Sequence, residues 1–320
     1  MNDLKMIVKM KFGSHLYGTD TKDSDIDYKG IFLPNKEEIL LNRIPNSYNF
    51  TTKENNIGKN TSNDIDNEIY SLHYFLKLAC EGQTVAIDML HAPESMILET
   101  SDIWKRIVNN RDKFYTKNLN AFVGYARKQA AKYGIKGSRL NEAKVLIDFL
   151  FNLISVSMYK DIKLKYIWDV LPIGEHCKFI EDNKNGIKQY IINGKILQET
   201  MRIDYALDII NRYYNAYGKR AELAAKNEGI DWKAVSHAIR AALQLKELLL
   251  YKTITFPLKE AKIVKEIKQG KLDYLSIVSP MLEDLMQEVE ELSLISDFPN
   301  KVNRKYWDDF LIEILEGEVI

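Results

Sequence analysis

The chain has few cysteines, no long apolar run and no excess of either charge, and each absence excludes a class of protein. Only two of its 320 residues are cysteines, Cys80 and Cys177. Their spacing matches no metal motif, so we expect free thiols in a reducing compartment. No apolar run is long enough to span a membrane, and the N-terminus Met1-Asn2-Asp3-Leu4-Lys5 does not resemble a signal peptide. The sequence therefore predicts a cytoplasmic protein without a membrane partner.

The charges balance, with 45 Lys and Arg residues against 45 Asp and Glu residues. A net charge of zero argues against a protein that coats nucleic-acid duplexes, but it leaves room for a local basic cleft. The hydrophobic fraction of 46% and the charged fraction of 28% are typical of a folded globular protein. This length predicts one large domain or two modest ones, each able to bury a core.

A glycine–serine pair stands between two predicted strands near the N-terminus. Residues 5–12 alternate between apolar side chains and lysines, which predicts a half-buried strand that runs directly into Gly13-Ser14. Residues Asp25–Leu33 predict a second strand that stops at Pro34. Gly13 allows the backbone to approach phosphate oxygens closely, and Ser14 can donate its hydroxyl to them.

Two aspartates begin the second predicted strand. Asp25 and Asp27 are two residues apart, so in an extended strand their side chains leave the same face. Neighbouring carboxylates repel each other unless a cation lies between them, and hard divalent cations prefer oxygen ligands. The pattern predicts a metal-dependent nucleotidyltransferase site. The alternative is a polar hairpin loop over Thr19–Ser24 that the aspartates merely cap.

The rest of the chain changes from mixed structure to helices. The polar segment 42–66 predicts a long loop that forms a lid over the site. Residues Tyr70–Ala79 predict a helix, Thr84–Leu90 a short strand, and Lys188–Leu197 a hairpin. Amphipathic periodicity after residue 100 predicts helices over 101–112, 117–133, 139–160, 200–226, 231–251, 258–269, 280–294 and 301–316.

The spacing from Gly13-Ser14 to Asp25 and Asp27 resembles the signature of the DNA polymerase β-like nucleotidyltransferases. With Tyr17-Gly18-Thr19 and Ser24, the string is similar to the RNA-ligase-associated (RlaP-type) phage and bacterial branch. Later similar segments are 66–76, 84–93, 235–240, 256–258 and 267–270. The resemblance implies an α+β fold: a small mixed-sheet nucleotidyltransferase head, which we place at residues 1–99, followed by a larger, mostly α-helical domain at 100–320.

The resemblance also implies a third carboxylate on a neighbouring strand, and Asp88 is our candidate. An acid inside an apolar strand is costly to bury without a partner. The alternative partner for Asp88 is a core Arg or Lys, in which case Glu68 or Asp66 is the third ligand. The implied cofactor is a pair of Mg²⁺ or Mn²⁺ ions that stabilise the attacking and leaving oxygens. Asp88 would also help to remove the acceptor proton.

Five further residues are candidates for nucleotide binding. His15 directly follows Ser14 and is placed to contact phosphate. Lys136 and Arg139 belong to a basic turn that suits phosphates, the alternative being a solvated helix face. His237 and Arg240 lie three residues apart on one face of a predicted helix, where they either reach the cleft or serve only the structure.

The predicted reaction transfers a nucleoside monophosphate from a nucleoside triphosphate such as ATP to an acceptor hydroxyl. The resemblance implies that the acceptor is an RNA end, extended without a template, and that the protein works with an RNA ligase. One alternative keeps the chemistry but changes the acceptor to a protein or a small molecule, as in AMPylation. The other is a non-catalytic nucleotide-binding module, which the presence of all four motif residues disfavours.

Overall fold

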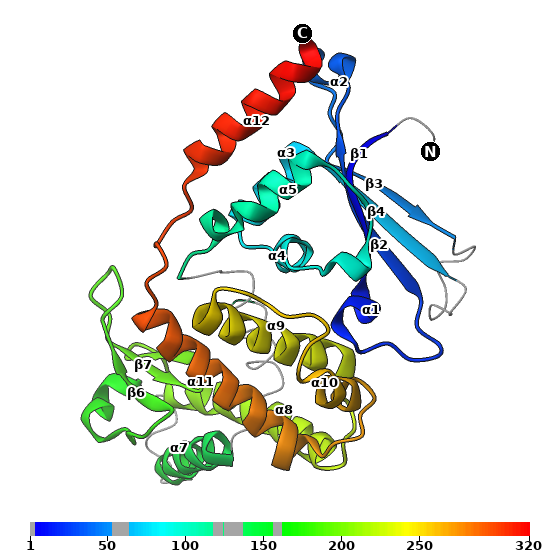
Figure 1. Cartoon of the computed structure of the whole chain (residues 1–320). Coiled ribbons are helices and arrows are strands. Elements are labelled where there is room, and N and C mark those ends of the chain that lie inside the picture. Colours follow the sequence, from blue (N-terminus) through cyan, green and yellow to red (C-terminus); the bar gives the residue numbers. More distant parts are fainter. Residues whose placement is uncertain (1–3, 53–63, 118–123, 125–136, 156–161) are drawn as a thin grey trace. The chain divides into compact units, whose positions relative to one another are not determined.

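Contacts divide the chain into two compact units. The computed structural model describes residues 4–52, 64–117, 124, 137–155 and 162–320 (Figure 1). The first unit contains Met1–Lys132, Asp231–Leu272 and Pro280–Ile320, and the second contains Tyr133–Ile230 and Asp273–Ser279. This grouping differs from the boundary that we predicted between residues 99 and 100, because the chain returns to the first unit after residue 230.

The first unit is built on a five-stranded mixed sheet with the strand order β3-β4-β2-β1-β5. Its strands are β1 (Lys5–Phe12), β2 (Ile26–Leu33), β3 (Ser47–Thr51), β4 (Ile65–Ser71) and β5 (Ile97–Thr100). The neighbours β2 and β4 run parallel, whereas the pairs β1–β2, β1–β5 and β3–β4 are antiparallel. The mixed sheet that the fold class required is therefore present.

The two predicted strands on either side of the glycine–serine pair are confirmed as β1 and β2. In β1 the side chains of Val8, Met10 and Phe12 are buried, as the alternating pattern predicts. The predicted loop at 42–66 is wrong in part, because it contains β3 and the first residues of β4. Its middle, residues 53–63, lies outside the described residues, so a lid there stays a prediction.

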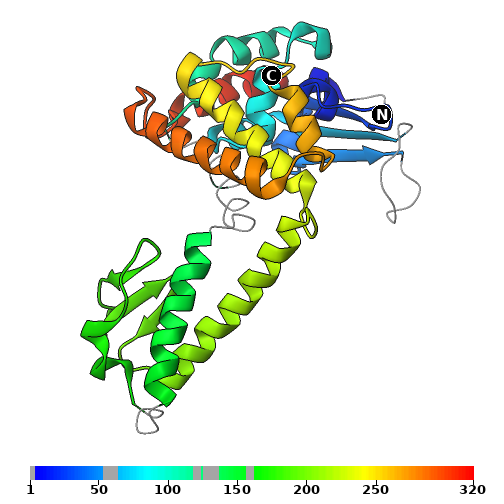
Figure 2. The ribbon, with the colours of Figure 1, turned by 90° about the horizontal axis from the view of Figure 1, so that it is seen from below.

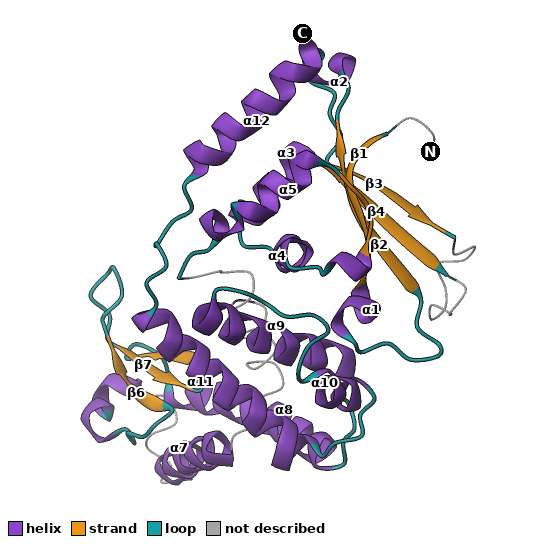
Figure 3. Ribbon diagram, in the orientation of Figure 1, coloured by secondary structure: helices purple, strands orange, loops and turns teal. Residues whose placement is uncertain are grey.

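Helices pack against one face of this sheet, where Figure 1 shows α3, α4 and α5. The helices of the first unit are α1 (Gly13–Tyr17), α2 (Lys36–Leu40), α3 (Leu72–Cys80), α4 (Thr84–Leu90), α5 (Asp102–Asn109), α9 (Trp232–Tyr251), α10 (Ala261–Lys268), α11 (Ser279–Ile295, whose first residue belongs to the second unit) and α12 (Arg304–Val319). Figure 3 shows this separation of strands and helices.

The predicted strand at Thr84–Leu90 is wrong, because this segment forms the helix α4. All residues of α4 from Ala86 onward are buried. A short helix buried on every side has the same continuous apolar run as a buried strand.

The second unit contains two long helices and a small sheet, which Figure 2 shows packed together. Its elements are α7 (Gly137–Ser155), β6 (Cys177–Ile180), β7 (Gln189–Ile192), β8 (Lys195–Gln198) and α8 (Ile203–Ala225). The predicted hairpin is confirmed as β7–β8, with Asn193 and Gly194 at positive φ of 49° and 77°. The helix predicted over 117–133 falls almost wholly outside the described residues. Among the helices that are described, none has the length and apolarity needed to cross a membrane.

A buried histidine at the end of α4 gives a testable pH dependence. The Nδ1 atom of His91 lies 2.8 Å from the Ile87 carbonyl oxygen, and the Tyr115 hydroxyl lies 3.0 Å from Nε2. Burial lowers the pKa of His91 from 6.5 to about 4. The unfolded chain therefore takes up this proton first, and stability should fall as the pH drops from 6.5 towards 4, by about 3 kcal/mol.

Urea unfolding at pH 7 and pH 4.5 measures this effect, and His91→Gln is expected to flatten the dependence. The same pH slope in His91→Gln and in the unmodified protein would contradict it.

Candidate active site

The glycine–serine pair lies at the junction between β1 and α1. Gly13 has φ of +63°, a left-handed conformation that favours glycine. A Cβ atom at this position would lie only 1.9 Å from Oδ2 of Asp27. The Ser14 hydroxyl is buried and has no hydrogen-bond partner among the described residues. Glycine is thus required for the close approach of α1 to Asp27, and Ser14 keeps a donor available to a ligand.

Three carboxylates converge beside this junction. Asp27 on β2 is the register partner of Asp66 on the parallel strand β4, and Asp25 precedes Asp27 by two residues. One carboxylate oxygen from each of Asp25, Asp27 and Asp66 lies within 4.8 Å of the others. Burial and the neighbouring Asp25 carboxylate raise the pKa of Asp27, against the effect of Lys29. This hard oxygen donor set fits Mg²⁺ or Mn²⁺, which would relieve the mutual repulsion.

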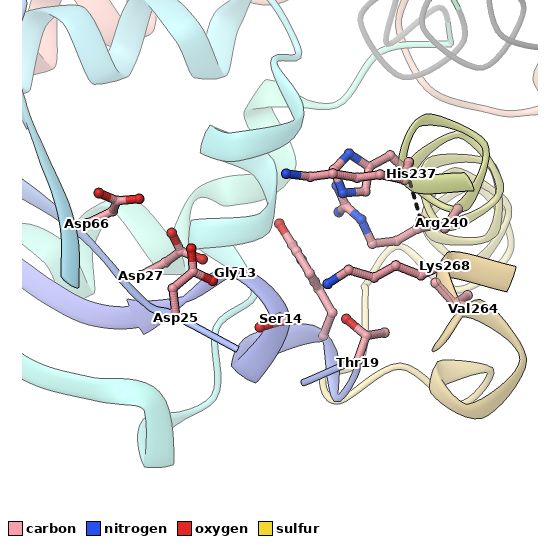
Figure 4. A pocket seen from close by; sticks show the side chains of 13 residues that line it. Gly13, Ser14, Thr19, Asp25, Asp27, Asp66, His237, Arg240, Val264 and Lys268 are labelled. Carbon is pink, nitrogen blue, oxygen red and sulfur yellow. Dashed lines mark hydrogen bonds between the residues drawn. The ribbon is translucent and has the colours of Figure 1, made fainter. Parts of the chain in front are cut away.

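A cavity of about 310 Å³ opens in front of these carboxylates. In Figure 4, Asp25, Asp27 and Asp66 lie on one side, and His237, Arg240 and Lys268 project from the other. The lining residues come from α1 and its following turn, from β2 and β4 with the residue before β2, and from α9 and α10: Gly13, Ser14, Tyr17, Thr19, Asp25, Asp27, Asp66, Lys233, Ser236, His237, Arg240, Val264 and Lys268. A second cavity, of about 360 Å³, lies over β2, β3 and β4 and shares Asp27 and Asp66 with the first.

The wall opposite the carboxylates is cationic. Lys233, His237 and Arg240 lie on one face of α9 and Lys268 lies at the end of α10. Burial lowers the pKa of Lys268, and the nearby Lys233 adds to this effect. Burial also lowers the pKa of His237 to about 4, so this imidazole is neutral at pH 7. Cations that repel one another at close range form a site that a polyanion would stabilise.

Removing one of these cations should weaken the binding of a nucleoside triphosphate. We expect Lys268→Ala to raise the apparent KM for the nucleotide roughly tenfold, because one charge-assisted hydrogen bond is lost. Lys262→Ala is the matched control, since Lys262 lies on the same helix and is exposed. Steady-state kinetics measure both variants. An equal KM in the two would contradict a role for Lys268 in binding.

Asp88 is not part of the carboxylate cluster, which corrects its predicted role as third metal ligand and proton acceptor. It lies on α4 with a fully buried side chain. Both of its oxygens are occupied: Oδ1 accepts a hydrogen bond from Gln244, and Oδ2 accepts from Tyr17 and Arg240. Burial raises the pKa of Asp88 and these donors oppose the shift. The alternative of a core ion pair is the observed arrangement, with Asp66 beside Asp25 and Asp27.

The structure brings together six of the predicted site residues in the first cavity: Gly13, Ser14, Asp25, Asp27, His237 and Arg240. His15 lies on α1 outside the cavity lining, with Nδ1 at 3.7 Å from the Asp20 carboxylate. Arg139 lies on α7 in the second unit and Lys136 lies outside the described residues, so their binding of phosphate stays a prediction.

Lys233 and Lys268 line the cavity but are not among the site residues predicted from the sequence. Lys233 precedes His237 by four residues and Arg240 by seven, so helical spacing alone would have placed it on their face. Lys268 belongs to a different helix, and no spacing within the sequence connects it to α9. Only the packing of α10 against α9 places the two lysines in one cavity.

The sequence of this chain matches both a protein family and an individual known protein. Residues 1–158 match the model of the RNA repair pathway DNA polymerase beta family, RlaP. The chain is 39% identical over 325 residues to the uncharacterized 38.9 kDa protein of the nrdC–mobD intergenic region of Enterobacteria phage T4. The alignment covers 96% of each of the two chains.

Among solved structures, a nucleotidyltransferase-like protein from Exiguobacterium sibiricum 255-15 aligns with 98% of this chain and 74% of its own. Its TM-score of 0.25 and identity of 8% are too low to support any argument. The family match and the full-length relative are much stronger. On these grounds, the chain belongs to the RNA repair pathway DNA polymerase beta family.

Proposed function

We propose that this protein is a metal-dependent nucleotidyltransferase that moves a nucleoside monophosphate from a nucleoside triphosphate to the hydroxyl of an RNA end. The observation that carries the proposal is the first cavity itself, where three carboxylates face three cationic side chains, Lys233, Arg240 and Lys268. One wall suits divalent cations and the other suits a polyphosphate. A substrate that carries both, a metal-bound triphosphate, satisfies the two walls together.

The residues of the cavity have separable tasks in this reaction. Asp25, Asp27 and Asp66 would hold divalent cations, which when bound stabilise negative charge on the attacking and leaving oxygens. The Ser14 hydroxyl donates a hydrogen bond to a phosphate oxygen, and Gly13, which has no Cβ atom, allows the Asp27 carboxylate to lie close to α1. Lys233, Lys268 and Arg240 neutralise the triphosphate. The acceptor hydroxyl loses its proton to water and its oxygen forms a bond to the α-phosphorus as the bond to pyrophosphate breaks. The catalysis consists mainly of positioning and charge neutralisation.

The second cavity supports an acceptor on the same carboxylates. Because it shares Asp27 and Asp66 with the first cavity, a hydroxyl bound there would lie next to the metal ligands. Phe50 on β3 offers a ring for stacking, and Asn49 and Thr51 offer polar contacts. The choice of RNA follows the family description, which names an RNA repair pathway. The RNA ligase partner stays a proposal that rests on the resemblance of the sequence motifs.

The acceptor is identified by following the label. The protein is incubated with each of the four nucleoside triphosphates labelled at the α-phosphate, Mg²⁺, and a mixture of single-stranded RNA and unrelated proteins. Label on RNA is the expected result. Label confined to protein would replace RNA by the second candidate acceptor, and the absence of label with every nucleotide and with Mn²⁺ would contradict the proposed reaction.

A further inference from the structure

A buried polar network joins two walls of the first cavity. Asp88 on α4 accepts hydrogen bonds from the Tyr17 hydroxyl at 2.9 Å and from Arg240 Nη1 at 3.0 Å, both at Oδ2, and from Gln244 Nε2 at 2.7 Å at Oδ1. Arg240 Nη1 also donates to Gln244 Oε1 at 2.8 Å. The guanidinium carbon of Arg240 lies 3.9 Å from the centre of the Tyr17 ring. One carboxylate thus holds the end of α1 and the middle of α9.

The network lies out of water but ends at the cavity. The side chains of Asp88 and Gln244 are fully buried, and that of Arg240 is 11% exposed. Tyr17 and Arg240 both line the cavity, whereas Asp88 does not. A buried carboxylate with donors on both oxygens fixes those donors in place, because each would lose its partner by moving. Asp88 can therefore act on a ligand only through Tyr17 and Arg240.

We propose that Asp88 is a positioning residue. It orients Arg240 and Tyr17 so that the triphosphate binds between Arg240 on α9 and Ser14 on α1. The inference rests on the proposed function, since it assigns the first cavity to a nucleotide. It gives Asp88 a task at the substrate that does not involve the metal. Removal of a metal ligand lowers the affinity for the metal ion, whereas removal of a positioning residue lowers the affinity for the nucleotide.

Three measurements on Asp88→Asn separate these roles. The expected result is a roughly tenfold rise in the KM for the nucleotide, with a smaller change in kcat and unchanged affinity for Mn²⁺ measured by titration without nucleotide. The affinity for inorganic triphosphate, measured by calorimetry, should fall to the same degree. In the double variant Asp88→Asn/Arg240→Gln the loss should not exceed that of Arg240→Gln alone, because Asp88 acts through Arg240.

Two other variants keep the test decisive if Asp88→Asn folds poorly. Tyr17→Phe removes one donor and keeps the ring beneath Arg240, so it should weaken triphosphate binding in the same direction but less. Ile87→Val changes a fully buried residue on the same helix outside the network, so it should lower stability and leave KM unchanged.

A fall in Mn²⁺ affinity in Asp88→Asn equal to that in Asp66→Asn would overturn the inference, as would a KM equal to that of Ile87→Val. The inference would also fail if the unmodified protein bound no triphosphate. If the unmodified protein binds triphosphate, Asp88→Asn weakens that binding and no nucleotide is transferred, the inference stands and the proposed function fails.

Discussion

Replacing any one of Asp25, Asp27 or Asp66 by asparagine is expected to lower the rate of nucleotide transfer roughly 10²- to 10³-fold. Each substitution removes one negative charge from a cluster whose carboxylate oxygens lie within 4.8 Å of one another. The affinity for Mn²⁺ should fall in parallel, because a neutral amide is a poorer ligand for a hard cation than a carboxylate. Transfer assays and Mn²⁺ titrations without nucleotide measure the two effects separately.

The control for these variants is Asp23→Asn, an exposed aspartate in the turn before β2. It should keep both the transfer rate and the Mn²⁺ affinity. The cluster also predicts a pH dependence. Protons compete with the metal at Asp27, whose pKa is raised by burial and by Asp25, so Mn²⁺ affinity should fall as the medium is acidified. Full transfer activity in Asp66→Asn would contradict the assignment of Asp66 as a metal ligand.

Gly13→Ala should cost roughly 10²-fold in the transfer rate, through the position of Asp27 rather than through any lost contact. An added Cβ would lie 1.9 Å from Asp27 Oδ2, so the carboxylate must move away from Asp25 and Asp66. The side chain would also strain a backbone with φ of +63°. We expect lower Mn²⁺ affinity together with the slower transfer.

A second glycine separates these two causes. Gly186 has a similar φ of +70°, but an added Cβ there would meet nothing within 4 Å. Gly186→Ala should therefore show the backbone strain as a lower thermal midpoint and keep the transfer rate. If Gly13→Ala transferred nucleotide as fast as Gly186→Ala, the close approach of Gly13 to Asp27 would have no part in the reaction.

The core of the site could be predicted from the sequence because it depends on local patterns. The alternation of β1, the Gly13-Ser14 pair and the two-residue spacing of Asp25 and Asp27 are all contained in one short stretch. The helix α9 is equally local, since Asp231 caps its first turn and its apolar residues keep helical spacing. Periodicity and caps indicate which elements form, but they do not indicate which elements pair.

The third carboxylate required such a pairing. Asp66 becomes a neighbour of Asp27 only because β4 runs parallel to β2, and a parallel neighbour needs a long connection that local patterns do not specify. Asp66 and Glu68 share one face of β4, and the sequence did not separate them. In the structure Glu68 is instead paired with Lys29, at 2.5 Å.

The strand prediction around Asp88 is wrong because a buried strand and a short buried helix have the same continuous apolar run. The run Val85-Ala86-Ile87 before it and Met89-Leu90 after it lacks polar residues that would show a helical or alternating period. Its partners Arg240 and Gln244 follow more than 150 residues later, at separations of 152 and 156. The sequence is compatible with both a metal ligand and a core ion pair at Asp88, and only tertiary packing decides between them.

The carboxylates and cations of the first cavity are proposed to transfer a nucleotide. The most direct test is to measure where the α-phosphate and the γ-phosphate of the nucleoside triphosphate go. The protein is given nucleoside triphosphate labelled at either the α- or the γ-phosphate, with RNA and Mg²⁺, and both RNA-bound label and released pyrophosphate are counted. We predict α-label on RNA in equal amount to pyrophosphate, no γ-label on RNA, and roughly 10²- to 10³-fold slower formation of both products with Asp27→Asn. Label on RNA from the γ-phosphate, or equal products from the Asp27→Asn variant, would contradict the account.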